Sequence, residues 1–366
     1  MDNKNDNIQY FEMVKNKCKQ CRRCSCPYSK IDIGDYTFGE LAKSLLELEN
    51  DIPQNVMDSI FGCHECGYCL KECPKGFDVK EFIINAREYL IYKKPHLKAM
   101  YNNVRVDRKQ HIFSKLKQTM DIVYDEALDS TSKCERLFFP SCHMAAKFSD
   151  LTNKTYQFLK DNNLVDGMSS ICCGNPLYAA GLKDEFESYI QKLSNQLYTC
   201  GVKEIVTPCP NCFDFFKRME AKGYLKSIVL IPLPKLLVEQ GIYARKRNDI
   251  NIITIHDACW DRRDGLFSTN IRKLFKNYEI ISSSHSGKST LCCGGGGLVP
   301  MYSLEMVKEA KEIKRNDYDK LQIDGVITTC FNCLDTLYNE LPIYHFLEFI
   351  IENVDYDKYI EAKRKV

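Results

Sequence analysis

The chain has 366 residues, enough for two or three domains with cores of their own, and twenty of them are cysteine. A formal charge of +2 gives no general attraction to nucleic acid or acidic lipid, so we expect no nucleic-acid partner. No stretch reaches about eighteen apolar residues, and the charged start does not resemble a secretory signal, so we expect a cytoplasmic protein without a membrane span that reaches a membrane only through a partner. In a reducing compartment, so many cysteines are more often metal ligands or redox groups than disulfides.

The first two cysteine groups predict two cubane [4Fe-4S] clusters. The second group has the C-x2-C-x2-C-x3-C-P spacing of bacterial ferredoxins and consists of Cys63, Cys66, Cys69 and Cys73. The upstream group has the same opening but a single residue before its fourth cysteine, and consists of Cys18, Cys21, Cys24 and Cys26. In such runs the fourth cysteine binds the neighbouring cluster. We therefore expect Cys73 to complete the first cluster and Cys26 the second, with Cys134 as the alternative fourth ligand and zinc as the alternative metal.

The segments around these cysteines predict helices. Apolar residues recur at helical spacing over residues 41–48 and 52–60, and Asp78 and Glu81 form a capping-box pattern that opens a helix to Leu90. Residues 93–117 hold eight basic residues against one acidic residue. We interpret this stretch as a solvated helical linker, with a docking face for an acidic electron carrier as the alternative.

The remaining chain contains a repeat. Its first copy contains Cys142, Cys172, Cys173, Cys209 and Cys212. Its second copy contains Cys259, Cys292, Cys293, Cys330 and Cys333. Equivalent cysteines lie 117 to 121 residues apart, a small drift that indicates duplication.

Each copy also repeats a pattern of secondary structure. Apolar strands such as "LFFP", "EIVT", "NIITIH" and "GVITT" run into the cysteines, and amphipathic helices follow them. Alternating strands and helices predict parallel sheets with the cysteines at the carboxyl ends of the strands. Five thiolates are one more than a zinc ion or a regular cubane cluster binds, so the count itself indicates an unusual cluster.

Paired ferredoxin runs followed by two CCG units resemble heterodisulfide reductase, in the form that fuses the helical ferredoxin part and the catalytic part in one chain. The resemblance covers about residues 10–350. It implies an N-terminal all-α ferredoxin domain followed by two α/β CCG domains with mainly parallel sheets. We expect a ferredoxin domain at 1–92, a basic helical linker at 93–133, and CCG domains at 134–248 and 249–366.

The same resemblance implies that each quintet binds a noncubane [4Fe-4S] cluster, and that a disulfide is cleaved between the two clusters with electrons from the cubane clusters. The shorter gap after Cys142 leaves a cubane cluster or zinc as alternatives in the first copy. The expected partners are an electron-donating or flavoprotein subunit and a small-molecule or protein disulfide. The second hypothesis is an electron-transfer subunit, similar to the iron–sulfur subunits of glycolate oxidase or anaerobic glycerol-3-phosphate dehydrogenase. A zinc-stiffened interaction module is the third.

Four further features are candidates for a role at the clusters, and three of them have a second interpretation. His256, shortly before Cys259, is the candidate acid that protonates a thiolate product, and a histidine satisfied by backbone at a strand end is the alternative. Gly294–Gly297 suit close backbone approach to a cluster, or an ordinary turn. Asn211 and Asn332 are candidate donors to cluster sulfides, or helix caps. His143, next to Cys142, is a weaker acid candidate.

Overall fold

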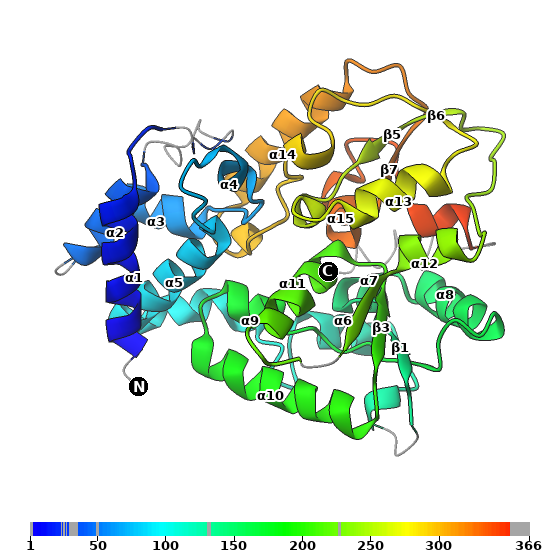
Figure 1. The fold of residues 1–366 in the computed structure, drawn as a ribbon, viewed down its shortest axis with the longest axis horizontal. Coiled ribbons are helices and arrows are strands. Elements are labelled where there is room, and N and C mark those ends of the chain that lie inside the picture. The colour runs from blue at the N-terminus through cyan, green and yellow to red at the C-terminus, as the bar shows by residue number, and fades with distance from the viewer. Residues whose placement is uncertain are drawn as a thin grey trace.

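The computed structural model describes residues 3–22, 24, 26, 28, 36–48, 51–129, 133–225 and 228–351. Within these ranges a helical N-terminal part, blue and cyan in Figure 1, lies beside two parallel-sheet units. No helix in the described ranges is long and apolar enough to cross a membrane.

In the described residues, five helices build the N-terminal part, and three of them are at positions that the sequence patterns predict. Leu41 and Leu45 are buried on one helix, and Val56 and Ile60 on the next, in one core with Phe11. The helices are α1 (Asn3–Lys17), α2 (Phe38–Leu46), α3 (Gln54–Phe61), α4 (Tyr68–Glu72) and α5 (Val79–Lys93).

Helix α5 begins at Asp78, whose side chain accepts the backbone N–H of Lys80 at 3.0 Å and that of Glu81 at 3.3 Å. The predicted capping box is only half formed. The Glu81 carboxylate instead accepts a hydrogen bond from Tyr178 at 2.6 Å and pairs with Lys222 at 3.0 Å. The Glu81 carboxylate therefore binds residues distant in the sequence, and these contacts connect the ferredoxin part to the first sheet unit.

A connecting stretch follows, with the bounds η1 (Pro95–Val104), α6 (Ile112–Thr119) and η2 (Ala127–Asp129). Its basic side chains are partly ion-paired. Arg105 pairs with Asp107 at 2.5 Å and with Glu185 at 3.3 Å, and Lys98 also pairs with Glu185. Part of the local positive charge is thus neutralised by the first sheet unit.

The first repeat forms a four-stranded parallel sheet of order β2-β1-β3-β4. Its strands are β1 (Arg136–Phe138), β2 (Gly167–Met168), β3 (Glu204–Thr207) and β4 (Val229–Pro232). Its helices are α7 (Cys142–Lys147), α8 (Ser149–Asp161), α9 (Asn175–Ala179), α10 (Lys183–Thr199), α11 (Pro210–Ala221) and α12 (Leu233–Glu239).

The second repeat forms a parallel sheet of the equivalent order, β6-β5-β7-β8. Its strands are β5 (Ile252–His256), β6 (Glu279–Ile280), β7 (Gly325–Thr328) and β8 (Ile343–His345). Its helices and turns are η3 (Cys259–Asp261), α13 (Leu266–Leu274), η4 (Gly287–Ser289), η5 (Val299–Met301), α14 (Leu304–Tyr318), α15 (Phe331–Leu337) and η6 (Phe346–Phe349). The matching strand orders confirm the predicted α/β fold with parallel sheets.

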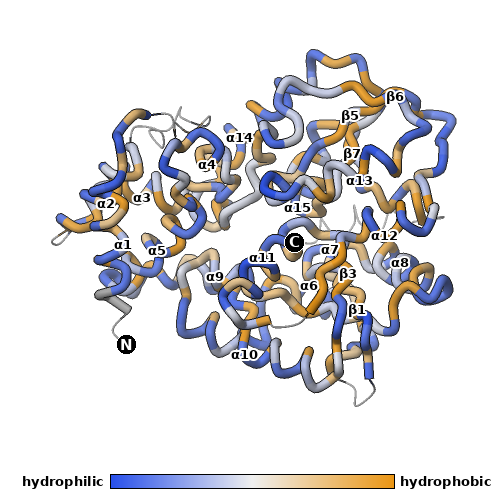
Figure 2. Tube along the Cα trace, in the orientation of Figure 1, coloured by the Kyte–Doolittle hydropathy of each residue, from blue (hydrophilic) through white to orange (hydrophobic). Residues whose placement is uncertain are grey.

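The central strands are apolar while the surrounding helices show polar outer faces (Figure 2). Leu137 and Ile205 in the first sheet and Ile253 and Ile327 in the second are completely buried, as strands covered on both faces require. The carboxyl ends of parallel strands lie at one edge of a sheet. Because β1, β2 and β3, and likewise β5, β6 and β7, lead toward the cysteines, each sheet brings its cysteines to that edge.

Candidate redox site

All ten cysteines of the two repeats line one cavity of about 160 Å³. Nine of them are buried, and Cys142 is partly buried. The first repeat contributes Cys142, Cys172, Cys173, Cys209 and Cys212, and the second contributes Cys259, Cys292, Cys293, Cys330 and Cys333. The tertiary structure therefore places both predicted quintets around a shared space.

Within each repeat the five thiols form a continuous chain of neighbours in the same order, in which each thiol affects the pKa of a neighbour. In the first repeat the chain runs Cys142, Cys172, Cys173, Cys212, Cys209. In the second it runs Cys259, Cys292, Cys293, Cys333, Cys330. In the described part of the chain, no three His, Cys, Asp or Glu side chains converge tightly enough to hold a single metal ion. The ligands of a four-iron core bind separate irons and need no such common point.

The electrostatics of both quintets favour a thiolate. Hydrogen bonds from Cys142 and Cys173 hold the pKa of the Cys172 thiol well below its usual range. In the second repeat, hydrogen bonds from Cys292 and Cys333 lower the pKa of Cys293 to about 5. Because the thiolate is the form that binds metals, each quintet has a ligand prepared for iron.

The glycine that follows each cysteine doublet has a conformational role. Gly174 and Gly294 both have a φ of +96°, in the region that favours glycine. In the second repeat this turn lets the N–H groups of Gly294 and Gly295 donate to the sulfurs of Cys292 and Cys293, each at 3.4 Å. Backbone donors thus already point at ligand sulfurs.

The ferredoxin cysteines lie in two groups. Burial is the main reason that the pKa of the Cys24 thiol is raised, and the charges of Cys18 and Cys73 add to it. Burial also raises the pKa of Cys26, whose charged neighbours include Cys66 and Cys63, and that of Cys69, whose neighbours include Cys63, Cys66 and Cys26. Cys21 is exposed. These neighbours support the exchange of fourth ligands, with Cys73 beside the first run and Cys26 beside the second.

The alternative ligand, Cys134, lies in the core of the first sheet unit. Its backbone N–H donates to the carbonyl of Cys200 at 2.9 Å, and its sulfur would meet a Cβ placed on Gly167 at 3.0 Å. Cys200 itself donates its thiol to the carbonyl of Ala127 at 3.6 Å. Both thiols therefore pack as core residues, outside the cavity that the ten repeat cysteines line.

Residues near both ferredoxin runs lie directly on the second repeat, since Tyr28 follows the upstream run and His64 belongs to the second. Tyr28 accepts a hydrogen bond from the backbone N–H of Cys292 at 2.5 Å, and its ring contacts that of His64 at 5.2 Å. A Cβ on Gly296 would meet the carbonyl of His64 at 2.5 Å and the sulfur of Cys292 at 3.6 Å. Glycine is therefore required here for close approach, although the approach is to the His64 backbone, whereas we predicted approach to a cluster.

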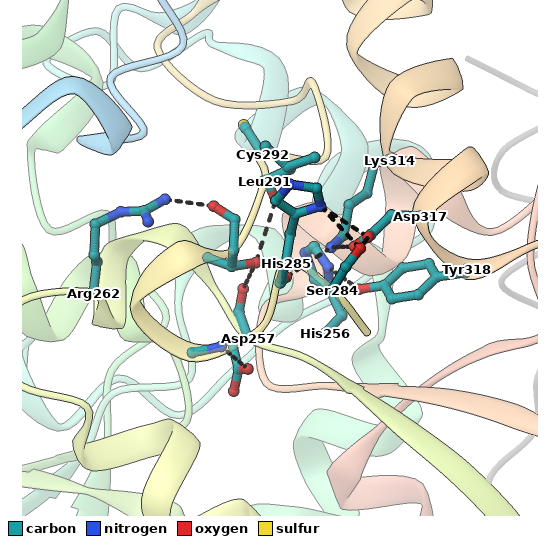
Figure 3. A network of polar contacts seen from close by, with 12 residues as sticks. His256, Asp257, Arg262, Ser284, His285, Leu291, Cys292, Lys314, Asp317 and Tyr318 are labelled. Carbon is teal, nitrogen blue, oxygen red and sulfur yellow. Dashed lines mark hydrogen bonds and ion pairs between the residues drawn. The ribbon is translucent and has the colours of Figure 1, made fainter. Parts of the chain in front are cut away.

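His256 does not line the cavity. Its Nδ1 lies 2.8 Å from the hydroxyl of Tyr318, and burial holds the pKa of the ring well below its usual range (Figure 3). Behind this pair, the buried Lys314 ammonium pairs with Asp317 at 3.0 Å, and Asp317 also contacts His285 at 2.9 Å. The structure thus places His256 within a buried polar network and not beside the ten sulfurs.

His143, in contrast, does line the cavity. Its Nε2 lies 3.5 Å from Asp335, and Lys147 pairs with the same carboxylate at 2.6 Å. Burial alone would raise the pKa of Asp335, but the hydrogen bond from His143 and the positive charges hold it well below its usual range. This contact joins the two repeats.

The predicted asparagines differ from each other, since Asn332 donates to the carbonyl of Gly295 at 2.8 Å while Asn211 Oδ1 has no partner among the described residues.

Sequence reasoning missed a buried ion pair at the cavity wall. Glu65 lines the cavity, and Arg87 donates to its carboxylate at 2.6 Å while both side chains are fully buried. Arg87 also donates to the carbonyls of Cys63 at 3.0 Å and Ala179 at 2.8 Å. The one sequence signal for this ion pair was an arginine, Arg87, among the apolar positions of α5. That signal did not identify Glu65 as its partner.

Comparison with known protein families agrees with this architecture. Residues 136–217 and 253–338 match the cysteine-rich CCG domain, and residues 12–78 match the 4Fe-4S dicluster domain. The fold and the site thus define an iron–sulfur electron-transfer protein. More specifically, the chain belongs to the proteins that join a 4Fe-4S dicluster ferredoxin domain to two CCG cysteine-rich domains.

Three relatives illustrate the range of this group. An uncharacterized iron–sulfur protein of Methanococcus maripaludis is 23% identical over 93% of this chain and 70% of its own length. One subunit of the fumarate reductase (CoM/CoB) of Methanothermobacter marburgensis is 22% identical over 86% of this chain and 66% of its own. FadF of Bacillus subtilis, a probable iron–sulfur-binding oxidoreductase, is 23% identical over 66% of this chain and 37% of its own length. The chain therefore spans about two thirds of the length of the first two of these relatives.

Among solved structures, a glutamate racemase of Bacillus anthracis aligns with a TM-score of 0.30 at 12% identity, over 64% of this chain and 82% of its own. That likeness is too weak to carry an argument.

Proposed function

We propose that this protein reduces a disulfide in the cavity shared by the ten cysteines, with electrons delivered through the ferredoxin part. The observation that carries the proposal is the convergence of two complete quintets on one space. Reduction of a disulfide consumes two electrons and two protons and yields two thiols, whereas an iron–sulfur cluster passes one electron at a time. Two cluster sites facing one substrate meet that requirement, and a linear relay does not need them.

We assign two cubane clusters to the ferredoxin cysteines and one noncubane [4Fe-4S] cluster to each quintet. When bound, such clusters supply one-electron steps and iron positions open to sulfur. The chain's own residues hold and orient that chemistry. The cysteines bind as thiolates, and the backbone donors at Gly294 and Gly295 stabilise negative charge on the sulfurs of Cys292 and Cys293.

The contact between Tyr28 and Cys292 supports entry of electrons at the second quintet. The second ferredoxin run also touches this repeat through Arg262, which donates to the carbonyl of Cys66 at 3.1 Å. Among the charges that affect the pKa of Cys66, that of Cys259 is the largest. We therefore propose the order from ferredoxin clusters to the second quintet, and then across the cavity to the first.

An electron-transfer subunit that works beside a flavoprotein is the second candidate. It is favoured by the relative that is named as a subunit of a larger enzyme. In that case the cavity would carry electrons without breaking a bond, and the flavoprotein partner would perform the chemistry on the substrate.

One experiment separates the two functions. Anaerobically purified protein is reduced with an artificial electron donor, and the thiols formed from added disulfide are measured. The oxidised protein is also examined for a paramagnetic signal that depends on thiol. We expect thiol formation and the thiol-dependent signal in the wild-type protein and in Cys134→Ala. We expect neither result in Cys293→Ala. Protein with full iron content that shows neither result would overturn disulfide reduction and leave electron transfer.

A further inference from the structure

A second cavity, of about 190 Å³, adjoins the central one where the ferredoxin part meets both repeats. Its charged lining consists of Lys71, Lys80, Arg262, Arg263, Lys288 and Asp214. We call this cavity the cationic pocket. Cys259 and Trp260 line both cavities, so they form the wall between them.

The cationic pocket has more positive charge than its carboxylates neutralise. Asp214 is already paired with Lys80 at 3.3 Å. Outside the lining, Asp78 pairs with Arg263 at 3.2 Å and Glu72 with Lys71 at 3.5 Å. Five cations therefore face three carboxylates.

The two remaining cations have no carboxylate within ion-pair distance among the described residues. Arg262 donates to the backbone carbonyls of Cys66 at 3.1 Å and Thr290 at 2.6 Å, and also to that of Lys288. These carbonyls fix the guanidinium but leave its net charge in place. Lys288 lines the cationic pocket and is exposed. A partly enclosed site with an unneutralised, fixed guanidinium favours an anionic ligand.

The repeat shows that these cations are an addition to the fold. At the offset of 117 residues, Arg262 and Arg263 correspond to Ala145 and Ala146, which are completely buried. Trp260 corresponds to His143. Because the first repeat builds its quintet with alanines at these positions, a quintet does not itself require the two arginines.

The wall residue suits a ligand with a short apolar body. Trp260 is the single tryptophan of the chain, and Lys80 places its ammonium 3.6 Å from the ring centroid. The ring is thereby fixed between the two cavities. A ligand that reaches past Trp260 has its charged end among the cations and its other end beside the ten sulfurs.

We infer that the cationic pocket binds the acidic group of a small organic disulfide whose sulfurs lie in the central cavity. The acidic group is a carboxylate, sulfonate or phosphate, since all three match the guanidinium and ammonium donors. This inference rests on the proposed function for the disulfide part. The anion site itself rests on the pocket alone.

The competing explanation is that the cations only balance the charge of the iron–sulfur clusters. Lys80 and Arg262 favour the thiolates of Cys66 and Cys259 and fit that role. Arg263 and Lys288 are not among the largest charges that act on these two thiols. Variants at Arg263 and Lys288 therefore test the ligand site without removing that balance.

The first test uses 3,3′-thiodipropionate, a dicarboxylate with a thioether in place of the disulfide, so that it binds without being reduced. Calorimetry on the anaerobic, cluster-containing protein measures its affinity, with neutral thiodiglycol as the uncharged probe. We expect Arg263→Gln/Lys288→Gln to weaken binding of the dicarboxylate about tenfold or more. Lys192→Gln/Lys273→Gln removes the same charge from exposed positions elsewhere and is expected to change the affinity less than about twofold.

If the double variant does not fold, the same binding measurement is made with Lys288→Gln alone, because Lys288 is exposed. Equal affinity for the dicarboxylate in the wild type and in the pocket variants, or equal affinity for the charged and neutral probes, overturns the inference. In that case the cations serve only the clusters.

The second test separates the two proposals. The KM for 3,3′-dithiodipropionate is compared with that for bis(2-hydroxyethyl) disulfide, and we expect the charged substrate to have the lower value by about tenfold. Reduction of both disulfides with equal KM contradicts the cationic pocket and leaves the proposed function. Reduction of neither, with charge-dependent binding of the thioether, contradicts disulfide reduction and leaves the anion site.

Discussion

Tyr28 and Cys292 are 264 positions apart in the chain, and the tyrosine hydroxyl accepts the backbone N–H of the cysteine at 2.5 Å. Both residues are buried. This bond joins the segment that follows the upstream ferredoxin run to the doublet of the second quintet. Together with the contact of Arg262 with Cys66 and the close approach of Gly296 to His64, it holds the ferredoxin part against the second quintet.

Tyr28→Phe removes that acceptor and leaves a buried N–H without a partner. We expect the apparent free energy of unfolding to fall by about 1–3 kcal/mol. Anaerobic urea titration, followed by the visible absorbance of the clusters, measures the change. Tyr198→Phe is the matched control because Tyr198 is 87% exposed, and an equal effect of the two substitutions would contradict the assigned role.

Arg87→Met should destabilise the protein strongly because it leaves Glu65 buried without its cation. Loss of one partner of a buried ion pair typically costs about 3–5 kcal/mol. The double variant Arg87→Met/Glu65→Leu removes the stranded charge as well, and we expect it to recover part of the loss. Urea titration of the three proteins measures both differences. A double variant that is less stable than Arg87→Met would show that the pair is not coupled as the 2.6 Å contact indicates.

Iron content should separate the ligand cysteines from the core cysteines. Four filled clusters correspond to about sixteen irons. Cys173→Ala and Cys293→Ala should each lose the irons of one cluster, measured by iron analysis after anaerobic purification. Cys134→Ala and Cys200→Ala should retain the full content, and iron loss in either of them would place a ligand where the structure has a core thiol.

Asp317→Asn should destabilise the protein because it leaves the buried Lys314 ammonium without its carboxylate partner. Burial alone would raise the pKa of Asp317, but hydrogen bonds from Ser284 and His285 and the charge of Lys314 hold it well below its usual range. A carboxyl with a depressed folded-state pKa stabilises the protein above its unfolded-state pKa, near 4, and loses that contribution as the pH falls further. We expect a loss of about 3–5 kcal/mol at pH 7.

Denaturant titration at several pH values tests the sign of this effect. The difference between the wild type and Asp317→Asn should stay constant from about pH 7 to pH 5 and shrink below about pH 4. Asp319→Asn is the control, since Asp319 is exposed and has a surface ion pair with Arg315 at 3.5 Å. A difference that grows on acidification would contradict the assigned partners.

The helices and strands that carry the cysteines could be predicted because their apolar residues recur at short range. Leu41 and Leu45, four positions apart, and the isoleucine-rich strand at Ile252–His256 each indicate their own burial. Contacts between distant residues have no such local signal. His256 was the predicted acid on sequence proximity to Cys259, yet the strand directs it toward Tyr318 and away from the cavity.

The glutamate of the predicted capping box shows the same limit. Local geometry allows Glu81 to return to its own helix end, but the partners Tyr178 and Lys222 belong to another unit of the fold. The Glu81 carboxylate binds Tyr178 and Lys222 in preference to the backbone N–H at its own helix end. The sequence does not show that these two partners lie near it.

The sequence by itself determined the cofactor class, the duplication and the parallel sheets, because cysteine spacing and apolar periodicity are local properties of the chain. Only the tertiary structure decided that both quintets face one cavity, that Tyr28 meets Cys292, and that Arg262 and Lys288 border a second cavity. Those relationships join segments up to 264 residues apart, and they are fixed by the packing of the two sheets and the ferredoxin helices on one another.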